Sequence, residues 1–170
     1  MNQQSIHPET RIGHVHLKVS DLERSVKFYT DVLGFEVTAR MGTSAAFLSA
    51  GGYHHHIGLN TWESYGGSPP PPNTTGLYHV AILLPNRKEL ARSVQRLLDH
   101  HWQIDGTADH GVSEALYLRD PDNNGIELYT DRPQEQWKYD AKGTISMVTL
   151  PLDFDSLMDE LHQSENLLHH

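Results

Sequence analysis

The sequence predicts an α+β fold built from two βαβββ units, and three observations support this prediction. Alternating apolar and polar residues over 11–20 lead into a helical apolar pattern over 22–33. After a proline-rich stretch, the same order of elements starts again at about residue 77. The sequence Gly-His-Val-His-Leu at residues 13–17 is echoed by Tyr-His-Val-Ala-Ile at residues 78–82, 65 positions later. We therefore expect two structurally equivalent halves.

The first unit is predicted at residues 11–62, after a flexible N-terminus at residues 1–10. Its first strand should be half-buried, because its residues alternate between two faces. The apolar face carries Val15, Leu17 and Val19, and the opposite face carries His14, His16 and Lys18. Asp21 is placed to cap the helix and Gly34 to end it. Short strands at about 35–40, 45–49 and 54–60 complete the unit.

A connector at residues 63–76 contains four successive prolines at 69–72, which exclude a helix or a central strand. The second unit follows at residues 77–132. It has a helix at about 87–100 and further strands at about 103–107, 114–119 and 126–130. We expect the first strands of the two units to lie side by side.

The remaining residues, 133–170, form a C-terminal tail. This tail contains an apolar stretch at 145–150 and a predicted short helix at 153–162, which we assign to packing or subunit contacts. His169 and His170 are interpreted as terminal residues without a role.

Composition restricts the chemistry that this chain can perform. Its 170 residues carry a net charge of −9, which argues against a nucleic-acid phosphate partner or an anionic membrane surface. No apolar run approaches the roughly 18 residues of a membrane span, so we expect a cytoplasmic protein. There is no cysteine, and any bound metal must therefore use nitrogen and oxygen ligands. Histidine, in contrast, occurs 13 times.

Three of these nitrogen and oxygen donors stand at matching places in the repeat. His14 and His79 lie on equivalent first strands, and Glu127 lies in the last strand of the second unit. All three are on the polar faces of their strands. They converge if the two units pair about a pseudo-twofold axis. Two imidazoles and one carboxylate suit a divalent first-row metal, and open coordination positions favour Fe(II) oxygen chemistry. The alternative is two ordinary sheet histidines and a solvated glutamate.

Glu127 belongs to a predicted hairpin whose loop, residues 120–125, is rich in turn-forming residues. Tyr117 precedes Glu127 by ten residues and shares its face, so the two side chains should be neighbours across the hairpin. We expect the Tyr117 hydroxyl to hydrogen-bond a bound phenolate. An aromatic side chain that packs on the loop with its hydroxyl in water is the alternative.

Several stretches together resemble the vicinal oxygen chelate superfamily, which includes glyoxalase I, resistance proteins and extradiol dioxygenases. The resemblance covers about residues 11–132 and rests on Ile-Gly-His-Val at 12–15, Asp-Leu at 21–22, Phe-Tyr at 28–29, Leu-Gly-Phe at 33–35, and the run from Asp120 to Leu128. It implies paired βαβββ modules that form an open, cup-shaped mixed β-barrel with the helices outside. It also implies metal-ligand roles for His14, His79 and Glu127.

Within this superfamily the chain is most similar to catechol 2,3-dioxygenases. The histidine run before Gly58 resembles the segment that holds their acid-base histidine. His110 and Tyr117, followed by Glu127, resemble their signature, in which a histidine and a tyrosine line the pocket. We add Tyr129, on the Glu127 face, to the expected substrate-binding residues. The stretch 53–60 has no acid to match the first-module carboxylate of glyoxalase I, which counts against that activity.

The identity of the acid-base histidine stays open between three neighbours. The resemblance selects His55, whereas strand alternation directs His54 and His56 into the cup. A bulge at the start of the strand would reconcile these two predictions, because it changes which residues of the strand face the cup. A polar strand end with no catalytic role is the remaining interpretation. We favour His55 slightly over His56.

These observations predict an Fe(II)-dependent extradiol dioxygenase that cleaves a catecholic aromatic with O2. Mn, Zn or Ni would suit a glyoxalase-like or resistance-type relative with different chemistry. A non-catalytic protein that binds a small aromatic molecule is a further alternative. We expect the two modules to pair within the chain and the protein to form a homodimer.

Overall fold

The computed structural model describes residues 5–162. Part of the expected flexible N-terminus, residues 1–4, and the end of the tail, including His169 and His170, lie outside the described residues. The described chain forms two four-stranded mixed sheets with the strand orders β1-β4-β3-β2 and β5-β8-β7-β6. The same order in both sheets confirms the predicted repeat of βαβββ modules.

The first sheet contains β1 Val15–Lys18, β2 Glu36–Met41, β3 Ala45–Ser49 and β4 Ile57–Asn60. β1 and β4 are parallel, and β3 pairs antiparallel with both β2 and β4. The alternation in the sequence is confirmed, because Leu17 and Leu59 are buried whereas His16 is exposed. Regular pairing in β4 begins only at Ile57, so the strand is shorter than the predicted 54–60.

The second sheet contains β5 Val80–Leu83, β6 Gly106–Asp109, β7 Ser113–Arg119 and β8 Gly125–Asp131. β5 and β8 are parallel, and β7 pairs antiparallel with β6 and β8. Gly125 is necessary where β8 begins, because a Cβ there would lie 2.1 Å from the Tyr78 carbonyl oxygen. This close approach brings the residues that precede β5 against the start of β8.

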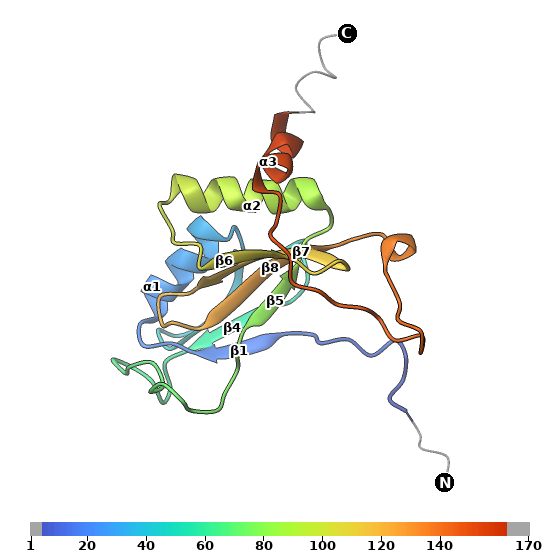
Figure 1. The fold of residues 1–170 in the computed structure, drawn as a ribbon. Helices are drawn as coiled ribbons and strands as arrows, with labels where there is room; N and C mark the ends of the chain where they lie inside the picture. The colour runs from blue at the N-terminus through green and yellow to red at the C-terminus, as the bar shows by residue number, and fades with distance from the viewer. Residues whose placement is uncertain (1–4, 163–170) are drawn as a thin grey trace.

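The helices pack on one side of the strands (Figure 1). α1 Leu22–Lys27 begins at the Asp21 cap, whose side chain accepts from the Arg24 N–H. It continues as a π-helical turn, η1 Phe28–Val32, because the Leu33 N–H reaches back five residues to the Phe28 carbonyl. α2 Arg87–Asp99 begins at its own cap, Asn86.

The C-terminal tail adds the short helix η2 Gln134–Gln136 and α3 Phe154–His162. α3 packs on the outer side of α2, with Leu157 fully buried between them (Figure 1). The Arg87 guanidinium of α2 also donates to the Ser156 carbonyl and to Glu160. The tail therefore contributes to packing of the second half.

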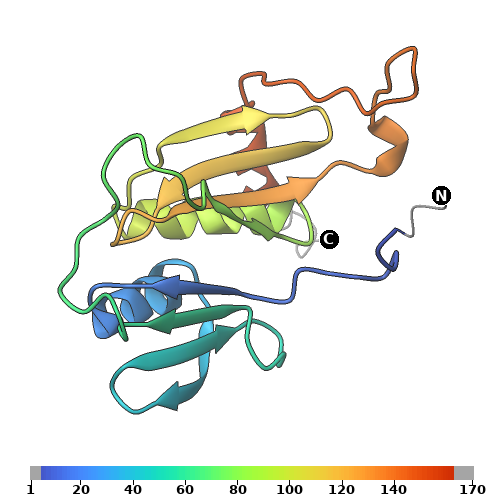
Figure 2. The ribbon, with the colours of Figure 1, turned by 90° about the horizontal axis from the view of Figure 1, so that it is seen from below.

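No ladder of backbone hydrogen bonds joins the two sheets in the part of the chain that the structure describes. We call the boundary between the two sheets the seam. The edge strands β1 and β5 face each other across it, and they run in opposite directions (Figure 2). The first strands of the two modules are therefore neighbours, as expected, but side chains and not backbone hydrogen bonds hold the two sheets together. Phe28 and Trp102, for example, bring their rings to 4.5 Å across the seam.

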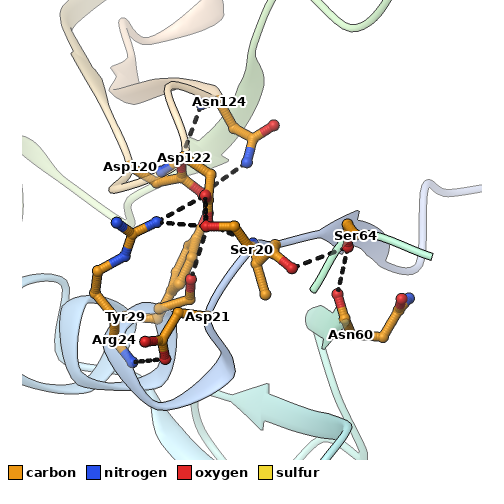
Figure 3. A network of polar contacts seen from close by, with 11 residues as sticks. Ser20, Asp21, Arg24, Tyr29, Asn60, Ser64, Asp120, Asp122 and Asn124 are labelled. Carbon is orange, nitrogen blue, oxygen red and sulfur yellow. Dashed lines mark hydrogen bonds and ion pairs between the residues drawn. The ribbon is translucent and has the colours of Figure 1, made fainter. Parts of the chain in front are cut away.

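A polar network also crosses the seam (Figure 3). Asp122, in the loop between β7 and β8, accepts hydrogen bonds from the Ser20 N–H and hydroxyl and from the Arg24 guanidinium at 2.7 Å. The Tyr29 hydroxyl donates to Asp120 at 3.1 Å. The turn-rich loop recognised in the sequence is therefore also the main polar contact between the halves.

Candidate functional site

Four side chains form a hydrogen-bonded group on the side of the second sheet away from α2. They belong to His79, His110, Tyr117 and Glu127. Glu127 stands near the middle of β8, where it pairs with Ala81 of β5 on one side and Tyr117 of β7 on the other. Its carboxylate contacts the His79 Nε2 at 2.9 Å and accepts from the Tyr117 hydroxyl at 3.1 Å. The strand register predicted from the sequence is confirmed for Tyr117 and Glu127.

His110 extends this group toward the edge of the sheet. Its Nε2 lies 2.7 Å from the Tyr117 hydroxyl, and its Nδ1 lies 2.8 Å from the Val148 carbonyl. The sequence placed His110 near this site, and the structure brings it into direct contact. The Val148 carbonyl was not foreseen, since a backbone acceptor leaves no residue signature in a sequence.

Burial gives this group an environment unlike water. The side chain of Glu127 is 12% exposed and that of His79 is 29% exposed. Burial, the Glu127 charge and the hydrogen bond to Glu127 raise the pKa of Tyr117 to about 12. A tyrosine with such a pKa stays a neutral hydrogen-bond donor throughout the physiological range.

Tyr129 lies two residues beyond Glu127 on the same face, but it pairs with Ala115 rather than with Tyr117. It is half-buried, and burial together with the Asp131 and Glu127 charges raises its pKa. It therefore lines the same face of the sheet without entering the hydrogen-bonded group. Its substrate-binding role stays a prediction.

The first sheet carries a separate cluster of histidines. The rings of His14 and His55 lie 4.4 Å apart, and the Nδ1 atoms of His54 and His55 are 2.7 Å apart. Phe47 packs against His55 from β3 with a ring separation of 5.1 Å. The ring of His16 also lies near Phe47, at a separation of 5.9 Å.

Two imidazoles of this cluster, those of His16 and His55, are harder to protonate than a free histidine. Burial and the neighbouring His14, His54, His16 and His56 lower the pKa of His55. Burial and His14 lower the pKa of His16. Each ring would lie beside further positive charge if it were protonated. His55 and His16 therefore stay neutral, and able to accept a proton, at lower pH than an isolated imidazole.

The position of the histidine run relative to β4 bears on the choice of base. β4 is assigned from Ile57, but the His56 N–H still donates to the Leu48 carbonyl and its carbonyl accepts from Val15, so the alternation reaches His56 and is lost only before it. His55 shares the side of Phe47 and His14. His56 instead contacts the Ser49 hydroxyl at 3.0 Å. The structure thus brings His55 against His14 and Phe47, and the choice of His55 or His56 as the base stays a prediction.

The three predicted metal ligands fall into two groups. His79 and Glu127 are in contact, whereas His14 lies with His55 in the histidine cluster. Within residues 5–162, no three histidine, aspartate or glutamate side chains come together as a metal site. The reason lies in the seam, because His14 and His79 precede edge strands of two sheets that share no backbone ladder.

The contacting pair nevertheless fits one face of a metal centre. Two ligand atoms at about 2.1 Å from one ion and at right angles lie about 3.0 Å apart. The 2.9 Å between the His79 Nε2 and the Glu127 Oε2 matches this spacing. The His79 Nδ1 is buried and has no hydrogen-bond partner among the described residues. His79 and Glu127 can therefore serve as two ligands, and His14 stays the predicted third.

A cavity of about 480 Å³ opens at the seam between the halves. It is lined by His14 and His56 and by apolar side chains from both halves, including Ile12, Ile82 and Leu84. An apolar cleft with a few polar groups is the usual form of a site for small molecules. Of the candidate site residues only His14 and His56 line this cavity, whereas His79, Tyr117 and Glu127 lie outside it.

Comparison with known families agrees with this architecture. Residues 11–128 match the family model described as the Glyoxalase/Bleomycin resistance protein/Dioxygenase superfamily. The chain is 46% identical to the catechol-2,3-dioxygenase of Bacillus subtilis over 156 residues, which cover 92% of this chain and 54% of that protein. It is 33% identical to biphenyl-2,3-diol 1,2-dioxygenase 3 of Rhodococcus globerulus, over 76% of this chain and 69% of that protein. The chain thus spans about half the length of the first of these relatives.

Solved structures show the same fold. A glyoxalase/dioxygenase from Nostoc punctiforme superposes with a TM-score of 0.61 and 22% identity, covering 76% of this chain and 98% of that one. Virulence protein STM3117 from Salmonella typhimurium superposes with a TM-score of 0.53 and 24% identity, covering 72% and 98%. Among the described residues, no helix has the length and apolar character needed to cross a membrane.

Proposed function

Because the chain belongs to the Glyoxalase/Bleomycin resistance protein/Dioxygenase superfamily, we propose that it works as an extradiol ring-cleaving dioxygenase on a catecholic aromatic molecule, with O2 as co-substrate. Two of its relatives are named as dioxygenases of catechol and of biphenyl-2,3-diol, which both carry adjacent ring hydroxyls. The observation that carries the proposal is the contact of His79 and Glu127 beside the Tyr117 hydroxyl.

In this proposal His79 and Glu127 hold a divalent metal, with His14 as the third ligand. Such a centre, when bound, would lower the pKa of the coordinated ring hydroxyls and, as Fe(II), would provide redox chemistry toward O2. Fe(II) is our first expectation for the metal, and Mn, Zn or Ni are the alternatives. Glu127 would supply the only negative charge among these ligands, which suits a dication.

The protein's own groups would then orient the substrate and move its protons. Tyr117 stays protonated, so its hydroxyl can donate to a ring oxygen of the bound catechol. In a second arrangement the Tyr117 hydrogen passes to His110, which contacts the hydroxyl, while the Tyr117 oxygen accepts a proton from a ring hydroxyl. His55, whose lowered pKa keeps it neutral, would act as the base for a second ring hydroxyl.

The decisive experiment is anaerobic loading of the purified protein with Fe(II), followed by exposure to a panel of catechols and air. We expect oxygen uptake together with the yellow absorbance of a ring-fission product. Parallel samples loaded with Zn, Ni or Mn serve as controls for chemistry that does not need a redox metal. Loss of the substrate without oxygen uptake would favour a lyase or isomerase relative. Binding of catechols after complete chelation, with no turnover under any condition, would favour a non-catalytic binding protein.

A further inference from the structure

The tail between η2 and α3 crosses the edge of the second sheet as a strap, which we define as residues 137–150. Three backbone hydrogen bonds attach it to the end of β6 and to the following residue, His110. Asp109 and Leu150 exchange N–H to carbonyl bonds of 2.9 Å in both directions. The Val148 N–H donates to the His110 carbonyl at 3.2 Å. The strap is thus attached at His110, which is a member of the hydrogen-bonded group, and at its neighbour Asp109.

The strap also contacts the His110 side chain, and that contact determines where the ring carries its hydrogen. A carbonyl oxygen can only accept, so the His110 Nδ1 at 2.8 Å from the Val148 carbonyl must be the donor. In the neutral imidazole the other nitrogen then has no hydrogen and acts as an acceptor. That atom, the Nε2, lies 2.7 Å from the Tyr117 hydroxyl.

The single hydrogen of the Tyr117 hydroxyl therefore has two acceptors. It can serve the His110 Nε2 at 2.7 Å or the Glu127 Oε1 at 3.1 Å, but not both at once. With the opposite tautomer the His110 Nε2 would be a donor, and it could not take the hydrogen. The Val148 carbonyl is therefore the group that makes His110 an acceptor for Tyr117.

We propose that the strap is a positioning element of the site, in which the Val148 carbonyl holds neutral His110 as the Nδ1–H tautomer so that its Nε2 can accept the Tyr117 hydrogen. The tautomer follows from the contacts alone. The effect on turnover rests on the proposed dioxygenase function. The residues of the strap are therefore expected to matter for proton transfer, although none of their side chains enters the hydrogen-bonded group.

The test removes the strap's backbone donors and leaves the His110 side chain intact. The double variant Val148→Pro/Leu150→Pro loses the two N–H groups that bond to His110 and Asp109. The matched control Val148→Ala/Leu150→Ala loses the same side chains but keeps both N–H groups. Both side chains are partly exposed, so neither variant removes a core residue. Long-range ¹H–¹⁵N spectra at about pH 8.5, two units above the ordinary histidine pKa, report the tautomer of each ring.

We expect the Nδ1–H pattern for His110 in the wild type and in the alanine control, with the signal identified by its loss in His110→Gln. The proline variant should show a mixture of tautomers. Its kcat in the oxygen-uptake assay should fall about tenfold, while KM changes less than about twofold. An Nε2–H ring in the wild type, or an unchanged tautomer in the proline variant, would overturn the proposal. If the double variant fails to fold, Leu150→Pro alone is judged by the same spectra. A wild-type protein without dioxygenase activity would refute the proposed function and would leave the tautomer result standing.

Discussion

Glu127 is both a largely buried residue of the second sheet and a proposed metal ligand. It is a charged side chain in the middle of a strand, and the structure provides it with two partners, His79 and Tyr117. Such pairing is what a half-buried carboxylate requires, because an unpaired buried charge is strongly unfavourable.

Replacing Glu127 by glutamine keeps the shape of this residue and removes its negative charge. Glu127→Gln should weaken divalent-metal binding by more than about 100-fold, since loss of a mere outer partner already costs about 10- to 100-fold. Metal content after dialysis, measured by elemental analysis, checks this. His55→Ala is the control and should retain metal but lower turnover. A full equivalent of tightly held metal in Glu127→Gln would show that the site lies elsewhere.

Tyr29 illustrates how a buried hydroxyl links pH to stability. It is fully buried, and both burial and the Asp120 charge raise its pKa well above the ordinary value of 10. The folded protein therefore retains a proton that the unfolded chain releases above pH 10, and stability must fall as the pH rises past that point. Tyr29→Phe should lose about 1 kcal/mol at pH 7 and make the alkaline decline shallower. Urea unfolding between pH 7 and pH 11 measures both effects, and an equally steep decline in the variant would contradict this assignment.

At the scale of elements, the end of η1 depends on a glycine for two separate reasons. Gly34 has φ of +85°, and a Cβ there would lie 1.9 Å from the Arg96 guanidinium of α2. That guanidinium donates to the Leu33 carbonyl at 2.7 Å, which satisfies one of the free carbonyls at the helix end. The glycine thus lets a cation from the second half cap a helix of the first.

Substitution of alanine separates these two reasons. Gly34→Ala should lower the free energy of unfolding by about 2–4 kcal/mol, because it combines a left-handed backbone with displacement of Arg96. Gly42→Ala is the matched control, since Gly42 also has a positive φ, of +56°, but has no atom within 4 Å of an added Cβ. It should lose only about 1–2 kcal/mol. Equal losses in the two variants, measured by urea unfolding, would show that the Arg96 contact adds nothing.

Much of this element structure could be predicted from the sequence, because alternation in strands and caps on helices are local properties. The register of Tyr117 with Glu127 followed from a hairpin loop of recognisable turn residues. The separation of His14 from His79 could not be predicted, since it depends on how two sheets pack at a seam. The π-helical turn after Lys27 and the strap contact at Val148 also escaped prediction, because both rest on backbone groups.

At the scale of the whole molecule, the two halves are held together mainly by side chains, and Asp122 is the most connected polar residue between them (Figure 3). Its side chain is 10% exposed and accepts from Ser20, Arg24 and Ser25. These partners all belong to the first half, so the loss of Asp122 leaves several donors at the seam without an acceptor.

Asp122→Ala should therefore lower the free energy of unfolding by about 1–3 kcal/mol. The control is Asp31→Ala, which removes an exposed carboxylate 3.9 Å from Lys27 on the same helix and should change stability by less than about 0.5 kcal/mol. Urea unfolding measures both. If the two variants lower the free energy of unfolding equally little, packing of apolar side chains alone holds the halves together.

The connector at residues 63–76 has a consequence for how the molecule can be assembled. It is largely exposed and contains no strand or helix, and neither the hydrogen bonds of Asp122 nor the Phe28–Trp102 ring contact involves its residues. The protein is therefore comparable to a heterodimer whose two subunits share one polypeptide. A chain divided between Pro72 and Asn73 should still yield a complex when both fragments are co-expressed. The connector would then act only by keeping the fragments near each other, at an effective concentration in the millimolar range.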